Sequence, residues 1–398
     1  MRSIASRTLL PVILALVLAA GTGCAISISG TPVRQQTDPA SLQVGNYQTV
    51  PRVLGNAKTD KQSRVRESQR LSDYVALPFE ADHDYTYECS NDVHPHLVTN
   101  HKGLGDILIN DTFDEVAHDL RGGWINTWCT GAESDEQHRE LSIAVLELPD
   151  AGRAAAVGPA LEHDDFTYNA DNHPVTLSKY PDSRAHWRPN VASLGSWTVH
   201  DRYVVFIKIV DELSAPNLPD LTARTERMLD VALPLLDKFA PTPADEFAHL
   251  PLDPDGILGR TLPTNPEETL RPDPDGAYTG RGALQSLSDA DLDFLTVGDV
   301  DLVGYGDAIV VHSRTGSAAE ALWQRWNPAT GKPDTQQNLA PPPDFPGDVG
   351  CFAILARGQV VFNQCTFHVD RYNVQVGARN VLELYQKTSA QYVLVTSR

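Results

Sequence analysis

The sequence lacks the short motifs that mark the commonest catalytic machineries. None of the patterns G-x-S-x-G, H-E-x-x-H and S-x-x-K occurs in the 398 residues, and neither does a Gly-rich phosphate loop. A catalytic triad is defined by geometry rather than by spacing, so a hydrolase without a recognisable motif stays open as an alternative. The absences favour a protein that binds or senses, and they predict no cofactor.

Positive charge is also scarce. The chain has 32 Lys and Arg residues against 52 Asp and Glu residues, a formal net charge of −20. Residues 1–23 carry two of the positive charges and no negative one, which leaves −22 on the remainder. A field of this sign excludes nucleic acid as a partner and gives no attraction to an anionic membrane surface.

No hydrophobic run is long enough to span a membrane. The longest, LLPVILALVLAA at residues 9–20, has 12 residues, whereas a span needs roughly 20. It follows Arg2 and Arg7 and precedes small residues, so we interpret residues 1–23 as a signal peptide. A cysteine directly after such a cut accepts the diacylglycerol and palmitate of a bacterial lipoprotein. Cys24 is therefore the predicted lipidation site, although Gly21 stands where an aliphatic residue is usual. An ordinary secreted protein is the alternative.

The cysteine count supports an extracytoplasmic location. Of five cysteines, Cys24 is assigned to lipid, and the other four can pair in an oxidising compartment. Three connectivities are possible, and the order in the chain favours Cys89 with Cys129 and Cys351 with Cys365. The second pair closes two apolar runs that a hairpin near Gly358 would place side by side. Free buried thiols are the alternative.

Composition divides the chain into five parts. Residues 24–45 are rich in Ser, Thr, Gln, Pro and Gly and resemble a flexible tether. Residues 241–276 are rich in proline, which excludes a continuous helix and suggests a linker. Two modules follow from this division, residues 46–240 and 277–398, after a signal peptide at residues 1–23.

The two modules share an order of strand, helix, hairpin and helix. In the first, a strand at 140–148 precedes an Ala-rich helix with Asp150 as its N-cap, and in the second a strand at 307–314 precedes a helix. The segments DRYVVF (201–206) and RGQVVF (357–362) take matching places in the two hairpins. A further helix is expected over residues 113–125, with Thr112 as its cap. We predict an α+β fold of two related modules, each a small, mostly antiparallel sheet packed by helices on one side.

Three segments carry a resemblance to a known family. CAISISGTPVR, VGNYQTVPR and LLDKFAPTPADEFAHLPLDPDGILGRTLP resemble cell-envelope lipoproteins of mycobacteria, nocardiae and rhodococci, whose function is unknown. The layout of the second half is similar to the extracytoplasmic sensor domains of mycobacterial receptor Ser/Thr kinases. The resemblance implies anchoring at the outer face of the cell membrane and binding of an envelope ligand or protein partner. It supplies no catalytic residue.

Two groups of side chains invite a ligand-binding interpretation. His94, His96 and His101 lie close together in sequence and could share a zinc or copper ion, but local hydrogen bonding explains them better, so no metal site is predicted. Trp124 and Trp128 precede Cys129 and suit core packing beside a disulfide. The alternative is that these tryptophans, with Trp323 and Trp326, line an apolar ligand groove.

Overall fold

The structure is a computed structural model, and it describes residues 41–89, 95–105, 107–131, 137–265, 274–285, 293–326 and 335–397. The predicted signal peptide, Cys24 and residues 24–40 of the predicted tether lie outside these ranges. Residues 41–45 are described, and Leu42 among them is buried against the second module.

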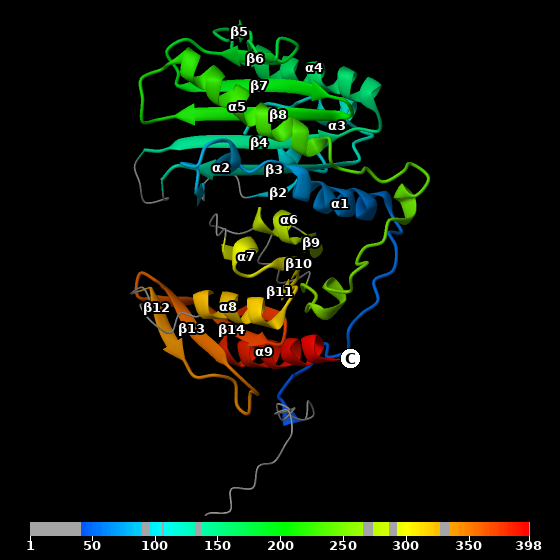
Figure 1. The fold of residues 1–398 in the computed structure, drawn as a ribbon, viewed down its shortest axis with the longest axis vertical. Coiled ribbons are helices and arrows are strands. Elements are labelled where there is room, and N and C mark those ends of the chain that lie inside the picture. Colours follow the sequence, from blue (N-terminus) through cyan, green and yellow to red (C-terminus); the bar gives the residue numbers. More distant parts are fainter. Residues whose placement is uncertain are drawn as a thin grey trace, which may run out of the picture. The chain divides into compact units, whose positions relative to one another are not determined.

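An antiparallel sheet of eight strands forms the first module (Figure 1). Its order is β1-β3-β4-β8-β7-β6-β5, and β2 also pairs with β3. The strands are β1 (Tyr87–Glu88), β2 (His96–Leu97), β3 (Gly122–Cys129), β4 (Arg139–Glu147), β5 (His173–Val175), β6 (Arg184–Trp187), β7 (Ser193–His200) and β8 (Tyr203–Asp211).

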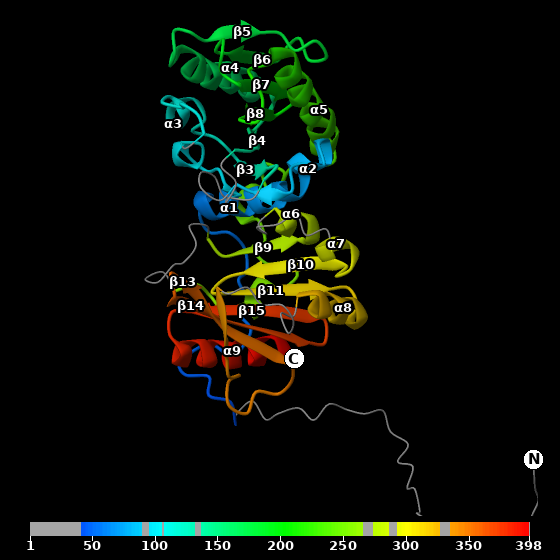
Figure 2. The ribbon, with the colours of Figure 1, turned by 90° about the vertical axis from the view of Figure 1, so that its left-hand side faces the viewer.

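Helices cover both faces of this sheet. Strand residues alternate between the faces, so Ile143 and Val205 pack with α5 (Leu218–Leu236), whereas Ala144 and Val204 pack with α4 (Ala151–Thr167). Figure 2 shows α4 and α5 on opposite sides of the strands. The α+β class is confirmed, but the expected one-sided packing is wrong, because the central strands are apolar on both faces.

The second module has a seven-stranded antiparallel sheet in the order β12-β13-β14-β15-β11-β10-β9. One face packs against α9 (Val381–Thr396), and the other against α8 (Gly316–Trp326) and α7 (Asp293–Thr296). The strands are β9 (Gly276–Thr279), β10 (Val300–Tyr305), β11 (Ala308–Ser313), β12 (Gln336–Leu339), β13 (Val349–Ala356), β14 (Gln359–Val369) and β15 (Tyr372–Ala378).

The two modules repeat one topology. Strands β3 to β8 with α4 and α5 take the same order along the chain and across the sheet as β10 to β15 with α8 and α9. The hairpin β7–β8 therefore corresponds to β14–β15. Each turns through an Asp-Arg pair followed by Tyr, and Asp201 and Asp370 have φ of 48° and 51°. The predicted match of DRYVVF with RGQVVF is wrong, because RGQVVF belongs to the β13–β14 hairpin.

The remaining helices lie before, within and between the two sheets. They are α1 (Asp60–Leu71), η2 (Ser72–Tyr74), α2 (Pro78–Ala81), η3 (His101–Gly103), α3 (Phe113–Val116), η4 (Phe247–His249), η5 (Leu258–Arg260) and α6 (Gly280–Leu284). Helix α1 contacts both β3 and β9. Within the predicted linker, Ile257, Leu258 and Leu262 are buried in the core of the second module.

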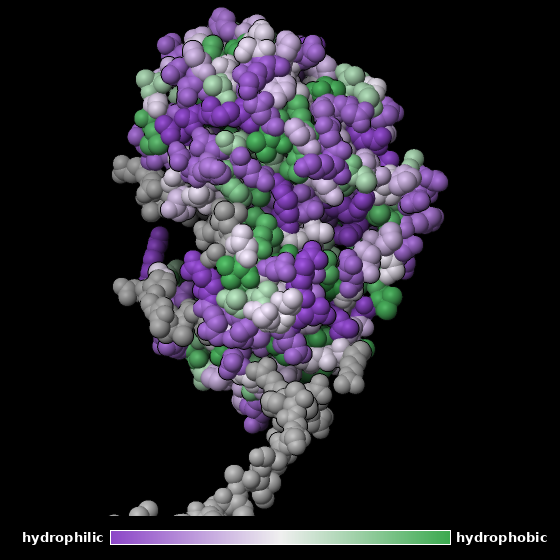
Figure 3. All heavy atoms as spheres, viewed as in Figure 1, coloured by the Kyte–Doolittle hydropathy of each residue, from purple (hydrophilic) through white to green (hydrophobic). Residues whose placement is uncertain are grey.

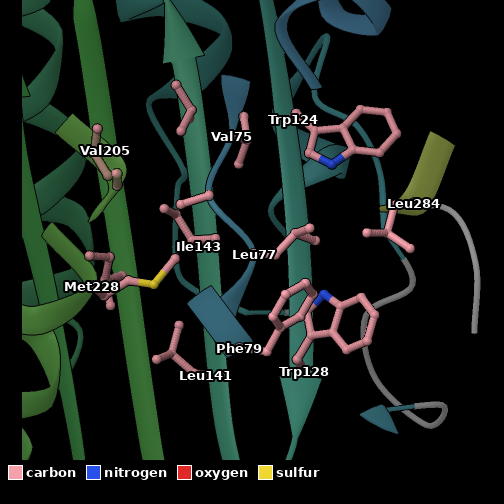
Figure 4. Close-up of a cluster of buried hydrophobic side chains, with 14 of the residues drawn as sticks. Val75, Leu77, Phe79, Trp124, Trp128, Leu141, Ile143, Val205, Met228 and Leu284 are labelled. Atoms are coloured by element: carbon pink, nitrogen blue, oxygen red, sulfur yellow. The ribbon is translucent and has the colours of Figure 1, made fainter. Parts of the chain in front are cut away.

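Trp124 and Trp128 lie on β3 and are fully buried (Figure 4). Their cluster includes Leu284 of α6, and the ring of Trp124 meets that of Tyr278 at 6.0 Å, so it joins side chains from both modules. These two tryptophans are core residues, as the packing interpretation predicted. The helix predicted for residues 113–125 ends at Val116, because Arg121 N–H donates to Glu147 O and two glycines then begin β3.

The surface is mostly polar. Figure 3 shows hydrophilic side chains over most of the visible face, in keeping with the acidic composition. Among the described helices, none combines the length and the apolar character that a membrane crossing requires.

Candidate functional site

A polar cavity opens between α4 and the strands β6, β7 and β8. Its volume is about 170 Å³, below the roughly 300–1,000 Å³ of pockets for drug-sized ligands, so it suits a small molecule. We call it the α4 cavity. Its lining comprises Ile107, Asp165, Asn172, His186, Arg188, Val191, Ser193, Gly195, Phe206 and Lys208.

An acid–imidazole pair forms the inner part of the α4 cavity. Nε2 of His186 lies 3.4 Å from Oδ2 of Asp165, and the two side chains are only 10% and 15% exposed. The ring of Phe166 meets the imidazole edge-on at 5.8 Å. The second imidazole nitrogen, Nδ1, is buried without a hydrogen-bond partner among the described residues. A buried polar atom of this kind needs an explanation, and a ligand would supply one.

Local sequence explains how the pair is held. Asp150 caps α4 by accepting from Arg153 N at 2.9 Å, and Asn172 Nδ2 donates to Phe166 O at 2.9 Å near the other end of the helix. Gly195 stands opposite His186 in the β6–β7 ladder, where a Cβ would lie 3.4 Å from the imidazole ring. Gly195 therefore leaves space for the imidazole ring of His186, and a larger side chain at this position would crowd that ring.

The cavity carries two cationic groups, Lys208 and Arg188. Lys208 Nζ donates to the carbonyl oxygen of Ile107 at 3.2 Å, and Arg188 is exposed. Among the described residues, no salt bridge joins either side chain to Asp or Glu. Burial raises the pKa of Asp165, although His186 and Lys208 act in the opposite direction. Lys208 and Arg188 against Asp165 give the lining a formal charge of +1, which suits an oxyanion.

Ser193 lines the same cavity and bears on the hydrolase alternative. A nucleophilic serine needs a hydrogen bond to its general base. Within the part of the chain that the structure describes, no hydrogen bond joins Ser193 to His186. The geometry brings Ser, His and Asp into one cavity but does not align them as a nucleophile, base and orienting acid.

A second cavity, of about 280 Å³, adjoins α1. Leu54, Val65, Leu252 and Leu258 give it an apolar lining. Arg66 also faces it, and its Nη1 donates to Ala277 O at 2.5 Å. The Ala277 carbonyl therefore already takes one of the hydrogen bonds that the half-buried Arg66 can donate.

The predicted histidine group divides between separate local partners. His94 lies outside the described residues. His96 Nε2 lies 3.0 Å from Gly103 O, and His101 Nδ1 lies 2.5 Å from Asp114 Oδ2. The structure thus gives His96 and His101 different neighbours and does not bring them to one shared ligand.

The four predicted disulfide cysteines form two bonds. Cys89 is bonded to Cys129, and Cys351 to Cys365, with Cα separations of 5.4 and 4.1 Å. Cys351 and Cys365 are directly opposite each other in the β13–β14 ladder, as the predicted hairpin requires. Disulfides of this kind are typical of proteins outside the cytoplasm.

No sequence motif marks the α4 cavity. Its charged residues come from α4, from β6 and the residue after it, and from β8, and they meet only because two hairpins set the strand order. One signal was present. Asp164 and Asp165 lie in the last turn of α4, where the helix dipole disfavours negative charge, so they need another stabilising contact.

The repeated sheets define a two-module α+β protein, and its first module carries a small polar cavity. The chain belongs to the family described as "Domain of unknown function (DUF7373)". The N-terminal model of this family matches residues 54–252, and its C-terminal model matches residues 257–398.

Other comparisons add little. No curated protein matches the chain. Among solved structures, it is similar to the extracellular domain of PknH from Mycobacterium tuberculosis, at 10% sequence identity and a TM-score of 0.27. That match covers 43% of this chain and 97% of the other. A TM-score this low supports no conclusion about fold or function.

Proposed function

We propose that this protein is a lipid-anchored envelope protein that binds a small oxyanion, a carboxylate or a phosphate, in the α4 cavity. The observation that carries the proposal is the set of cationic groups around the cavity. Lys208 and Arg188 form no salt bridge with Asp or Glu among the described residues, and the buried His186 lines the same cavity beside Asp165. A bound oxyanion would accept hydrogen bonds from these groups.

The location rests on the sequence and the disulfides. A signal peptide followed by Cys24 supports lipid attachment at the outer face of the cell membrane, with the tether holding the modules away from the bilayer. Both disulfides support folding in an oxidising compartment. An envelope ligand is therefore the natural occupant.

Calorimetric titration with inorganic phosphate and with citrate tests the binding. We expect one site per chain for at least one of these probes. Lys208→Met should weaken the binding of that probe about tenfold or more, because a hydrogen bond to a charged group is worth about 1.5–3 kcal/mol. Arg184→Met is the matched control, since Arg184 lies on β6, is exposed and does not line the cavity. Absence of heat with both probes, or equal affinity of the Lys208 variant and the parent, would contradict the proposal.

The hydrolase alternative has its own test. If Ser193 acted as a nucleophile, the parent would hydrolyse 4-nitrophenyl acetate faster than Ser193→Ala. We expect equal rates, because no hydrogen bond joins Ser193 to His186 within the described structure. A large loss in the variant would favour catalysis over binding.

A further inference from the structure

The two cysteines of the first disulfide and one nearby histidine carry atoms of the kinds that bind metal ions. The sulfur atoms of Cys89 and Cys129 and one imidazole nitrogen of His138 all lie within 4.8 Å of one another. Cys129 ends β3, Cys89 follows β1, and His138 directly precedes β4, so neighbouring strands of one sheet bring them together. The second disulfide is in no such group among the described residues.

The backbone of His138 is held by hydrogen bonds to Glu212, whereas one nitrogen of its imidazole ring has no hydrogen-bond partner among the described residues. Glu212 N donates to His138 O at 3.1 Å, and His138 N donates to a carboxylate oxygen of Glu212 at 3.4 Å. Nδ1 of His138 is buried and has no hydrogen-bond partner among the described residues. Disulfide sulfur is a weak acceptor, so the oxidised pair does little for this nitrogen.

We propose that reduction of the Cys89–Cys129 bond creates a zinc site made of the two thiolates and His138, with water as the fourth ligand. A dithiol reductant supplies two electrons and two protons, which break the S–S bond and leave two thiols, and the dithiol is oxidised to its own disulfide. Zn²⁺ then displaces the two thiol protons and binds both sulfurs and the imidazole nitrogen. The bond and the metal therefore exclude each other.

The present geometry needs only small movements to hold the ion. Zn–S and Zn–N bonds of about 2.3 and 2.0–2.1 Å place the ligand atoms of a tetrahedral site about 3.6–3.8 Å apart. After the S–S bond breaks, the sulfurs must separate to that distance. The imidazole nitrogen of His138 lies within 4.8 Å of each sulfur, so it must move toward the sulfurs by no more than about 1.2 Å. Two thiolates and one imidazole suit Zn²⁺ in ligand type.

Cobalt provides the direct test, because Co²⁺ replaces Zn²⁺ and its thiolate bonds absorb light. The full chain is reduced with a phosphine, which leaves no competing dithiol, and is titrated with Co²⁺ and then Zn²⁺. We expect one thiolate-bound Co²⁺ per chain, displaced by Zn²⁺, in the reduced protein and none in the oxidised protein. His138→Ala should weaken the binding about 10-fold or more.

The second disulfide gives the matched control. The double variant Cys351→Ser/Cys365→Ser should keep the cobalt signal, and Cys89→Ser/Cys129→Ser should lose it. Circular dichroism of each reduced variant establishes that it is folded. If a folded, reduced parent shows no cobalt–thiolate absorption, or if His138→Ala binds as tightly as the parent, the proposal is wrong. Loss of folding on reduction without rescue by Zn²⁺ would also overturn it.

Discussion

Glu147 is an acidic residue buried without a partner, and its replacement gives the sharpest stability prediction. Its side chain is 0% exposed, and neither carboxylate oxygen has a hydrogen-bond partner among the described residues. Glu67, also fully buried, lies on α1 nearby. Burial first, and then the charge of Glu67, raise the pKa of Glu147 from 4.5 to about 8. The opposing positive charges are Arg121, Arg202 and Arg70.

The sign of the pH dependence follows from this shift. A carboxyl whose pKa is higher in the folded state holds its proton there and releases it on unfolding. Its contribution to stability is complete below pH 4.5 and is lost as the pH rises through about 8. At 1.36 kcal/mol per pKa unit, the free energy of unfolding should fall by about 4 kcal/mol between pH 5 and pH 9 from this group alone.

Glu147→Gln removes the titration and keeps the shape of the neutral acid. We expect the variant to equal the parent within about 1 kcal/mol at pH 5 and to exceed it by about 4 kcal/mol at pH 9. Urea unfolding followed by tryptophan fluorescence at pH 5, 7 and 9 measures the difference. Glu115→Gln, an exposed position, is the control and should show no such trend. A parent–variant difference that stays constant across the pH range would refute the reasoning.

Three further predictions concern the anchor, a disulfide and a helix end. Cys24→Ala should move the protein from the membrane fraction to the medium, which immunoblotting of cell fractions checks; a variant that stays in the membrane contradicts lipid anchoring. Cys351→Ser/Cys365→Ser should lower the free energy of unfolding by about 3 kcal/mol, because the bond closes a loop of 14 residues. Asn380 caps α9 by accepting from Glu383 N at 2.8 Å, so Asn380→Ala should cost about 1 kcal/mol in urea unfolding, whereas Asn380→Asp should cost much less.

Sequence patterns predicted the elements whose signals are local. The strand expected at residues 140–148 corresponds to β4, Asp150 caps α4 as expected, and the closing helix expected in the first module corresponds to α5. The β13–β14 hairpin and its disulfide follow from two apolar runs around a turn. Each of these features depends on residues that are neighbours in the chain.

The sequence did not predict the features that depend on tertiary contacts. Phe113, Val116, Leu120 and Trp124 have helical spacing, but pairing of Arg121 with Glu147 starts a strand instead. The true partner of the Asp201 turn is the Asp370 turn, which only the sheet order identifies. The α4 cavity could not be predicted from the sequence for the same reason, because its charged residues belong to no contiguous motif.

The most direct test of the proposed binding site is an NMR titration of the histidine side chains with phosphate and with citrate. The ¹⁵N-labelled imidazole of His186 is identified by its absence in His186→Gln. His312 is an internal control, because it pairs with Asp301 at 2.5 Å in the second module, outside the α4 cavity. We predict that the His186 signals shift with saturation while those of His312 do not. Unchanged His186 signals with both probes, or equal shifts at both histidines, would contradict a site in the α4 cavity.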